Sequence, residues 1–117
     1  MRLPNAQNAE VDGDKIVNYL LNSAHPDNGG KFQFFTQLGF SREHPEVMAN
    51  ALKAVAVDNE VANTTESPHG QKYVMVGPIQ SPSGKTPLVQ TIWILDKGSE
   101  TARLVTAYPH KDERPHD

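Results

Sequence analysis

The chain has 117 residues, a net charge of −3, 37% hydrophobic residues and no cysteine. This length fits a single domain (1–117) with a polar lead-in (1–8), an ordered core (about 9–109) and a frayed, charged tail (110–117). The composition excludes disulfides and a cysteine nucleophile, disfavours a protein that covers many nucleic-acid phosphates, and contains no apolar run long enough to cross a membrane.

A short strand is expected at Ala9–Val11, followed by a helix with Asp12 or Asp14 as its N-cap. The helix should end near Asn22 or Ser23. Its apolar positions are Ile16, Val17, Tyr19, Leu20 and Leu21.

The next stretch changes from a turn to a helix. The run His25–Gly30 (HPDNGG) is typical of a turn, because Pro fixes φ, Asn and Asp bond their own backbone, and Gly takes positive φ. A helix is predicted from Lys31, stopped by Gly39. The residues on its apolar face are Phe32, Phe35 and Leu38. This glycine elbow sets His25 and Lys31 at fixed places on the surface.

A third helix, of about fifteen residues, is predicted after Ser41, which we expect to be its N-cap, with Pro45 in the first turn. Its apolar positions recur at helical spacing and are Val47, Met48, Ala51, Leu52, Val55 and Ala56. The stretch from Asp58 to Gly70 has no periodicity and is predicted to be a long mobile loop.

From residue 71 the hydrophobic period becomes two, which predicts strands at Lys72–Gln80, Thr86–Leu95 and Thr101–Tyr108. Gly77-Pro78 indicates a bulge or an edge position in the first of them. Short turns make the strands neighbours. The predicted fold class is therefore α+β, with N-terminal helices packed on one face of a C-terminal antiparallel β-meander of three to four strands.

Alternation along the last predicted strand gives its residues two faces. One face carries Leu104, Thr106 and Tyr108. The other carries Arg103, Val105 and Ala107. With Thr91 from the preceding strand, the face of Thr106 and Tyr108 offers a group of hydroxyls, although exposed Thr and Tyr on a strand most often reflect β-propensity alone.

Two residues of the elbow are candidates for chemistry. His25 can act as acid or base near neutrality, and Lys31 beside Gly29 and Gly30 can stabilise an anion; the alternative is that both are ordinary surface residues. A nucleotide-binding phosphate loop is excluded, because the leading Gly and a Ser or Thr after the lysine are missing. The five histidines (25, 44, 69, 110 and 116) lack metal-ligand spacing, so no metal and no cofactor are expected.

Several stretches together resemble a known family. They are LPNAQNAEVDGDKIVNYLLNSAHPDNGGKFQFFTQLGF near the N-terminus, Met75–Gly84, the strand with Thr91 and Trp93, and RLVTAYP at Arg103–Pro109. They resemble a bacterial domain of unknown function, number 6883. The helices-then-meander order and the T-x-Y ending are in turn similar to the barnase–EndoU–colicin–RelE superfamily of metal-independent ribonucleases.

The resemblance implies a toxin-like ribonuclease in which the 2′-hydroxyl of RNA attacks the adjacent phosphate. The implied catalytic residues are His25, Lys31, Thr106 and Tyr108. The implied substrate-binding residues are Thr91, Gly29 and Gly30. The implied partners are RNA and a cognate immunity or antitoxin protein, with no membrane, in the cytoplasm or after delivery as part of a toxin system.

The alternative is a non-catalytic protein-binding module of immunity or adaptor type, whose acidic charge would suit a basic toxin. It would use the exposed sheet face or an edge strand, with an exposed apolar patch around Trp93 and Ile79. A third interpretation is a scaffold piece of a larger assembly. The enzyme, in contrast, requires its catalytic residues to converge on one small anion.

Overall fold

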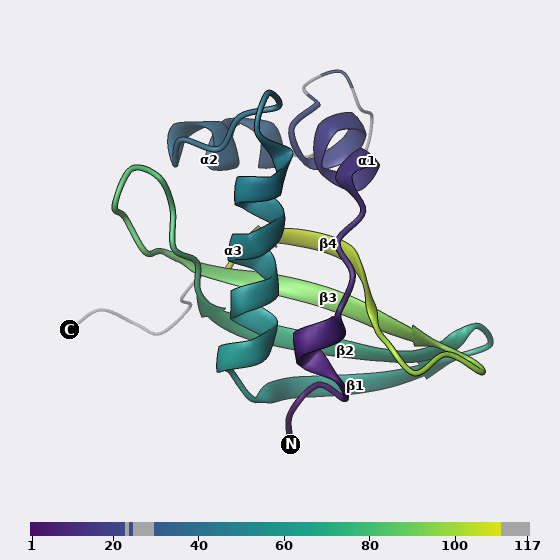
Figure 1. Ribbon diagram of the computed structural model, residues 1–117. Helices are drawn as coiled ribbons and strands as arrows, with labels where there is room; N and C mark the ends of the chain where they lie inside the picture. Colours follow the sequence, from purple (N-terminus) through teal and green to yellow (C-terminus); the bar gives the residue numbers. More distant parts are fainter. Residues whose placement is uncertain (23, 25–29, 111–117) are drawn as a thin grey trace.

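A computed structural model describes residues 1–22, 24 and 30–110 (Figure 1). The elements are η1 (Ala6–Asn8), α1 (Gly13–Lys15), the π-helical η2 (Ile16–Leu20), α2 (Lys31–Gln37), α3 (Pro45–Asp58), β1 (Val61–Ser67), β2 (Gly70–Pro78), β3 (Leu88–Asp96) and β4 (Arg103–Pro109). The strands form one antiparallel sheet in the order β1-β2-β3-β4. This confirms the predicted α+β class with a C-terminal meander.

The helix ends follow the predicted caps in two of three places. Asp12 is the N-cap of α1, and its side chain accepts a hydrogen bond from the Asp14 backbone N–H at 2.9 Å. Gly39 follows α2 with φ +97°, a left-handed conformation that favours glycine. Ser41 is not the cap of α3: its hydroxyl accepts from the Glu43 N–H at 3.1 Å, and the helix begins later at Pro45, where proline's missing N–H costs nothing.

Strand β1 corrects the prediction of a long loop between Asp58 and Gly70. It pairs with β2 from Val61 opposite Met75 to Ser67 opposite Gly70. Residues 62–66 are all exposed, so the segment shows no alternation of apolar and polar side chains. Its strand conformation is held by backbone pairing with β2, which no local pattern records.

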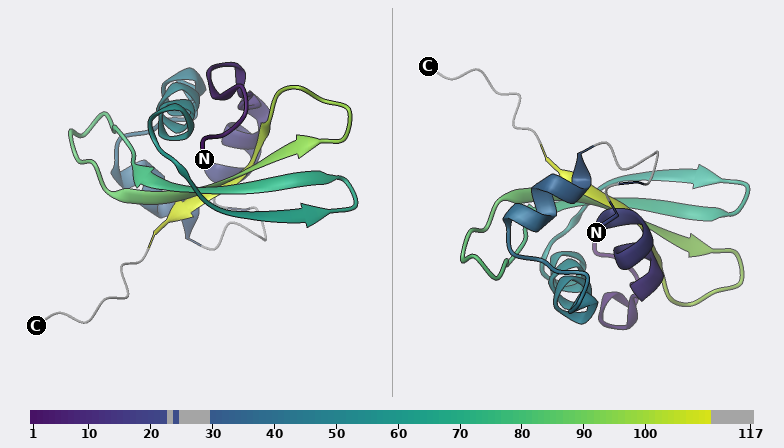
Figure 2. Two further views of the ribbon diagram at one scale, coloured as in Figure 1. Left: turned by 90° about the horizontal axis from the view of Figure 1, so that it is seen from below. Right: turned by 90° about the horizontal axis from the view of Figure 1, so that it is seen from above.

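The structure has two layers (Figure 2), with α3 lying across β2 and β3 on one face of the sheet. Helix α2 contacts β4 at the far edge. The expected strand at Ala9–Val11 is a single parallel bridge, in which Glu10 exchanges backbone hydrogen bonds with Ala102 and Leu104, both at 2.9 Å. The N-terminal segment therefore covers the outer edge of β4. It also reaches β1, where the Val61 N–H donates to the Met1 carbonyl at 2.7 Å. Along the rest of β1, no other strand of the described residues pairs with the outer edge.

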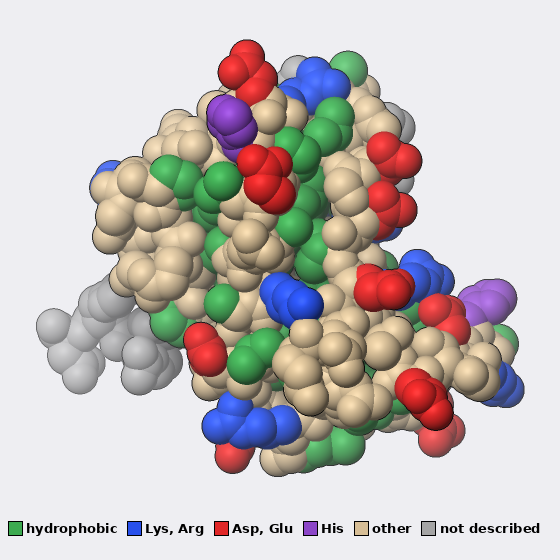
Figure 3. All heavy atoms as spheres, in the orientation of Figure 1, with side chains coloured by type: hydrophobic (Ala, Val, Ile, Leu, Met, Phe, Trp, Pro, Cys, Tyr) green, Lys and Arg blue, Asp and Glu red, His purple; other side chains and the backbone are tan. Residues whose placement is uncertain are grey.

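The helix-side surface carries acidic and basic side chains interspersed over α3 and the neighbouring segments (Figure 3). No large area of a single sign is visible on this side. An anion-binding surface is therefore better sought elsewhere on the molecule.

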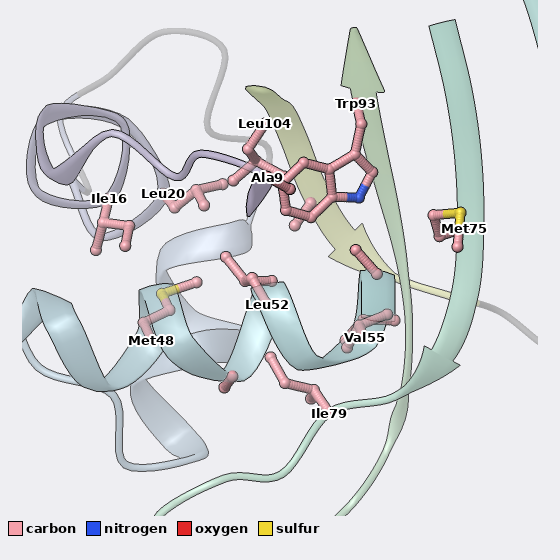
Figure 4. Close-up of a cluster of buried hydrophobic side chains, with 14 of the residues drawn as sticks. Ala9, Ile16, Leu20, Met48, Leu52, Val55, Met75, Ile79, Trp93 and Leu104 are labelled. Carbon is pink, nitrogen blue, oxygen red and sulfur yellow. The ribbon is translucent and has the colours of Figure 1, made fainter. Parts of the chain in front are cut away.

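The core lies between the helices and the inner face of the sheet (Figure 4). Ile16 and Leu20 of η2 meet Met48 and Leu52 of α3, and the indole of Trp93 projects from β3 beside Leu104. Trp93 and Ile79 are both 0% exposed. The prediction of an apolar surface patch around these two residues is therefore wrong, because both side chains lie in the core.

Candidate functional site

A β-bulge decides which side chains of β4 reach the outer face of the sheet. Thr91 pairs with Ala107 and Trp93 pairs with Leu104, and the register shifts between Ile92 and Trp93. Leu104 and Ala107 thus both face the core, at 3% and 0% exposure. The predicted grouping of Leu104 with Thr106 was wrong, because simple alternation fails across a bulge.

The same bulge leaves Thr106 and Tyr108 together on the outer face. Thr106 lies opposite Ile92 and Tyr108 lies opposite Gln90. The Gln90 side-chain amide donates to the Tyr108 hydroxyl at 2.6 Å, and its oxygen lies 3.4 Å from Nδ1 of His110. The imidazole of His110, the amide of Gln90 and the phenol of Tyr108 thus form a row at the C-terminal end of β4.

Tyr19 links the helices to this face. Its hydroxyl lies 3.1 Å from Oγ1 of Thr106, although 87 residues separate them in the chain. The ammonium groups of Lys15 and Lys31 lie 5.4 Å and 5.2 Å from the centroid of its ring. Lys31 is the first residue of α2 and follows Gly30, whose φ of +89° turns the chain into the helix. Two cations and two hydroxyls thus meet beside β4.

The surroundings of Tyr19 lower the pKa of its phenol. Partial burial acts to raise this pKa, but the hydrogen bond to Thr106 and the interactions with Lys31 and Lys15 outweigh it. The positive charge of the two ammonium groups also makes the neutral phenol a stronger hydrogen-bond donor, whereas the bond to Thr106 lowers the pKa by stabilising the phenolate.

The predicted site residues divide into three groups. Lys31 reaches Thr106 through Tyr19, and Tyr108 lies two positions along β4 on the same face as Thr106. Thr91 is 0% exposed and accepts from Nε1 of Trp93 at 2.9 Å, so its expected place among the outer-face hydroxyls was wrong. His25 and Gly29 lie outside the described residues.

The sequence interpretation missed four members of this cluster. Tyr19 was assigned to the apolar stripe of its helix, and its polar hydroxyl is the signal that it reaches beyond the core. Gln90 follows from the β3–β4 register, because it lies directly opposite Tyr108. The other two members are Lys15 and His110, for which the signal in the sequence was weaker.

Three further features concern residues 1–22, 24 and 30–110. No group of three or more His, Cys, Asp or Glu side chains is arranged to hold a metal ion. Within the same residues, no helix is long and apolar enough to cross a membrane. An open cleft of about 490 Å³ also lies beside the cluster, lined by charges of both signs from Glu10, Asp12, Lys15 and Arg103.

The chain belongs to the family described as Domain of unknown function (DUF6883), whose model matches residues 2–111. No protein with a curated description matches it. Among solved structures, it is similar to a chain from the "Contact-dependent growth inhibition toxin - immunity protein complex from Klebsiella pneumoniae 342". The TM-score is 0.68 at 19% identity, over 92% of this chain and 97% of that chain. At this identity the likeness shows a shared fold.

Proposed function

We propose that this protein is a small toxin-like ribonuclease domain that cleaves RNA without a metal ion. The observation that carries the proposal is the contact of Tyr19 with Thr106 beside two lysines. Ammonium groups stabilise phosphate charge, hydroxyls donate to phosphate oxygens, and a nearby imidazole transfers protons. The row of Tyr108, Gln90 and His110 supplies that imidazole on the same side of β4.

The reaction joins the 2′-oxygen of a ribose to the adjacent phosphorus and breaks the bond from phosphorus to the 5′-oxygen of the next nucleotide. A base takes the 2′-hydroxyl proton, and an acid gives a proton to the departing 5′-oxygen, so the products are a cyclic phosphate and a free 5′-hydroxyl. His25 is the acid or base predicted from the sequence, and His110 is the candidate for the other role.

The remaining groups act on the phosphate. Lys31 stabilises the extra negative charge that develops on the phosphate oxygens as the 2′-oxygen attacks. Thr106 and Tyr108 donate hydrogen bonds that hold the phosphate in line. Gly29 and Gly30 remain the predicted substrate-binding positions of the elbow.

The comparison with solved structures supports a toxin system. The similar chain comes from a complex of a growth-inhibition toxin and its immunity protein, and the likeness covers nearly all of both chains. We therefore include a cognate immunity protein as the expected partner, and delivery as part of a toxin system as the expected route to the RNA.

A non-catalytic binding module of immunity type is the second candidate. Two observations favour it. The net charge of −3 suits a basic partner. Strand β1 is an edge strand with residues 62–66 exposed, to which a partner's strand could pair beyond Val61, whose N–H bonds to Met1. This candidate requires no catalytic activity from the cluster at β4.

The test is incubation of the purified protein with total bacterial RNA in EDTA. We expect cleavage by the wild type, with His25→Ala and Lys31→Ala each slower by roughly a hundredfold or more. Lys85→Ala, which removes an exposed charge from the turn before β3, is the matched control and should cleave normally. Intact RNA beside well-folded wild type would contradict the nuclease and favour the binding module.

A further inference from the structure

We infer that Tyr19 is a positioning residue that turns the hydroxyl proton of Thr106 toward the substrate phosphate. The inference rests on the proposed function. It gives Tyr19 of η2 a role that follows neither from the sequence motifs nor from the likeness to known proteins.

The geometry leaves two arrangements of protons. The Tyr19 and Thr106 hydroxyls are 3.1 Å apart, and either can donate. If Thr106 donates to Tyr19, its only proton is used and it cannot donate to a phosphate oxygen. If Tyr19 donates to Thr106, the Thr106 proton stays available for the substrate.

The surrounding charges favour Tyr19 as the donor. Lys15 from α1 and Lys31 from α2 are the charged side chains that act on its phenol within the described part of the chain. The side of η2 that faces α3 meets Met48 and Leu52, which do not titrate. Positive charge beside the ring makes the phenol more acidic and strengthens its hydrogen bond to Thr106.

Deprotonation of Tyr19 reverses the arrangement. A phenolate can only accept, so the Thr106 proton turns toward Tyr19, and the new negative charge repels the phosphate. Since the pKa of Tyr19 is lowered from its usual value near 10, substrate binding and cleavage should decline at a lower pH than an ordinary tyrosine would allow.

The decisive variant is Tyr19→Phe, which keeps the ring beside the two lysines and removes only the hydroxyl. We expect kcat for RNA cleavage to fall about tenfold with a smaller change in KM, as for one lost positioning hydrogen bond. We also expect the alkaline decline to move up to the range where lysines lose their charge. Tyr73→Phe is the matched control, since Tyr73 is a buried tyrosine on the core face of β2, and it should leave both properties unchanged.

A second readout separates this inference from the proposed function. A 2′-deoxy oligonucleotide lacks the attacking hydroxyl, so its binding can be followed across pH whether or not the protein cuts RNA. If the wild type cleaves nothing, the nuclease proposal fails, but weaker and less pH-dependent binding by Tyr19→Phe still supports the inference. Equal binding and equal pH dependence in the two proteins would overturn it, as would a wild type that neither binds nor cleaves.

Discussion

The hydroxyl of Thr91 forms a hydrogen bond inside the core and does not reach the surface. It is fully buried, and it accepts the hydrogen bond of the Trp93 indole N–H at 2.9 Å. Trp93 is itself fully buried, so this acceptor satisfies a donor that water cannot reach. The role of Thr91 is therefore one of stability, at a distance from the hydroxyls of the outer face.

We expect Thr91→Val to destabilise the protein by about 1–3 kcal/mol, because a similar shape is kept while the buried indole N–H loses its partner. Urea unfolding measures this change. Thr91→Ser keeps an oxygen at the position and should lose less. RNA cleavage by the folded variant should be normal; a loss of cleavage without a loss of stability would return Thr91 to the site.

The candidate site was predictable only in part from its residues. Thr106 and Tyr108 follow from a T-x-Y pattern on a strand, because alternate residues share a face. Lys31 follows from its place after a glycine turn. The hydroxyl of Tyr19 indicated a polar contact but not its partner, because the ring fits the periodicity of a core-facing helix and the contact with Thr106 spans 87 residues.

At the scale of elements, the hairpin between β1 and β2 requires glycine at position 70, the first residue of β2. Its φ is +153°, and a Cβ there would collide with the backbone carbonyl oxygen of Leu95 on β3. The neighbouring strand cannot yield without losing its own pairing. Glycine at this position is thus required by the close approach of two strands.

Gly70→Ala should therefore destabilise the fold by roughly 2 kcal/mol or more, measured as a fall in the midpoint of thermal or urea unfolding. Gly13→Ala is the matched control: nothing lies within 4 Å of a Cβ at that position in α1. It should be neutral or slightly stabilising. Equal stability of the two variants would show that β3 adjusts to the added methyl.

The elements differ in how far local pattern defines them. Helix α3 was predicted because its buried residues recur at helical spacing, and all of them fall on one stripe (Met48, Ala51, Leu52, Val55 and Ala56). Strand β1 was not, because its exposed residues give no period and only pairing with β2 makes it a strand. The register shift between Ile92 and Trp93 is likewise absent from the local pattern, because simple alternation does not show where a bulge occurs.

At the scale of the whole molecule, the net charge of −3 limits how the proposed nuclease could bind RNA. An acidic chain cannot rely on a broad basic surface, so under the proposed function we expect the two lysines beside Tyr19 to supply the main contacts with phosphate. Affinity for a single-stranded probe should then depend only weakly on salt.

We expect the logarithm of the binding constant to fall against the logarithm of salt with a slope of about −1.4, which is about −0.7 for each of two neutralised phosphates. The double variant Lys15→Met with Lys31→Met should bring the slope close to zero. Lys85→Met should leave it unchanged. A steep slope that survives the double variant would place the nucleic acid on another surface.

The contact between Tyr19 and Thr106 also has a consequence for when the cluster forms during folding. Thr106 is synthesised 87 residues after Tyr19, so a growing chain cannot assemble the cluster until β4 has been made. Such a contact between distant parts of the sequence forms slowly, since a long loop must close first. A chain that unfolds loses the cluster in the same way, and regains it only when β4 and η2 have refolded together.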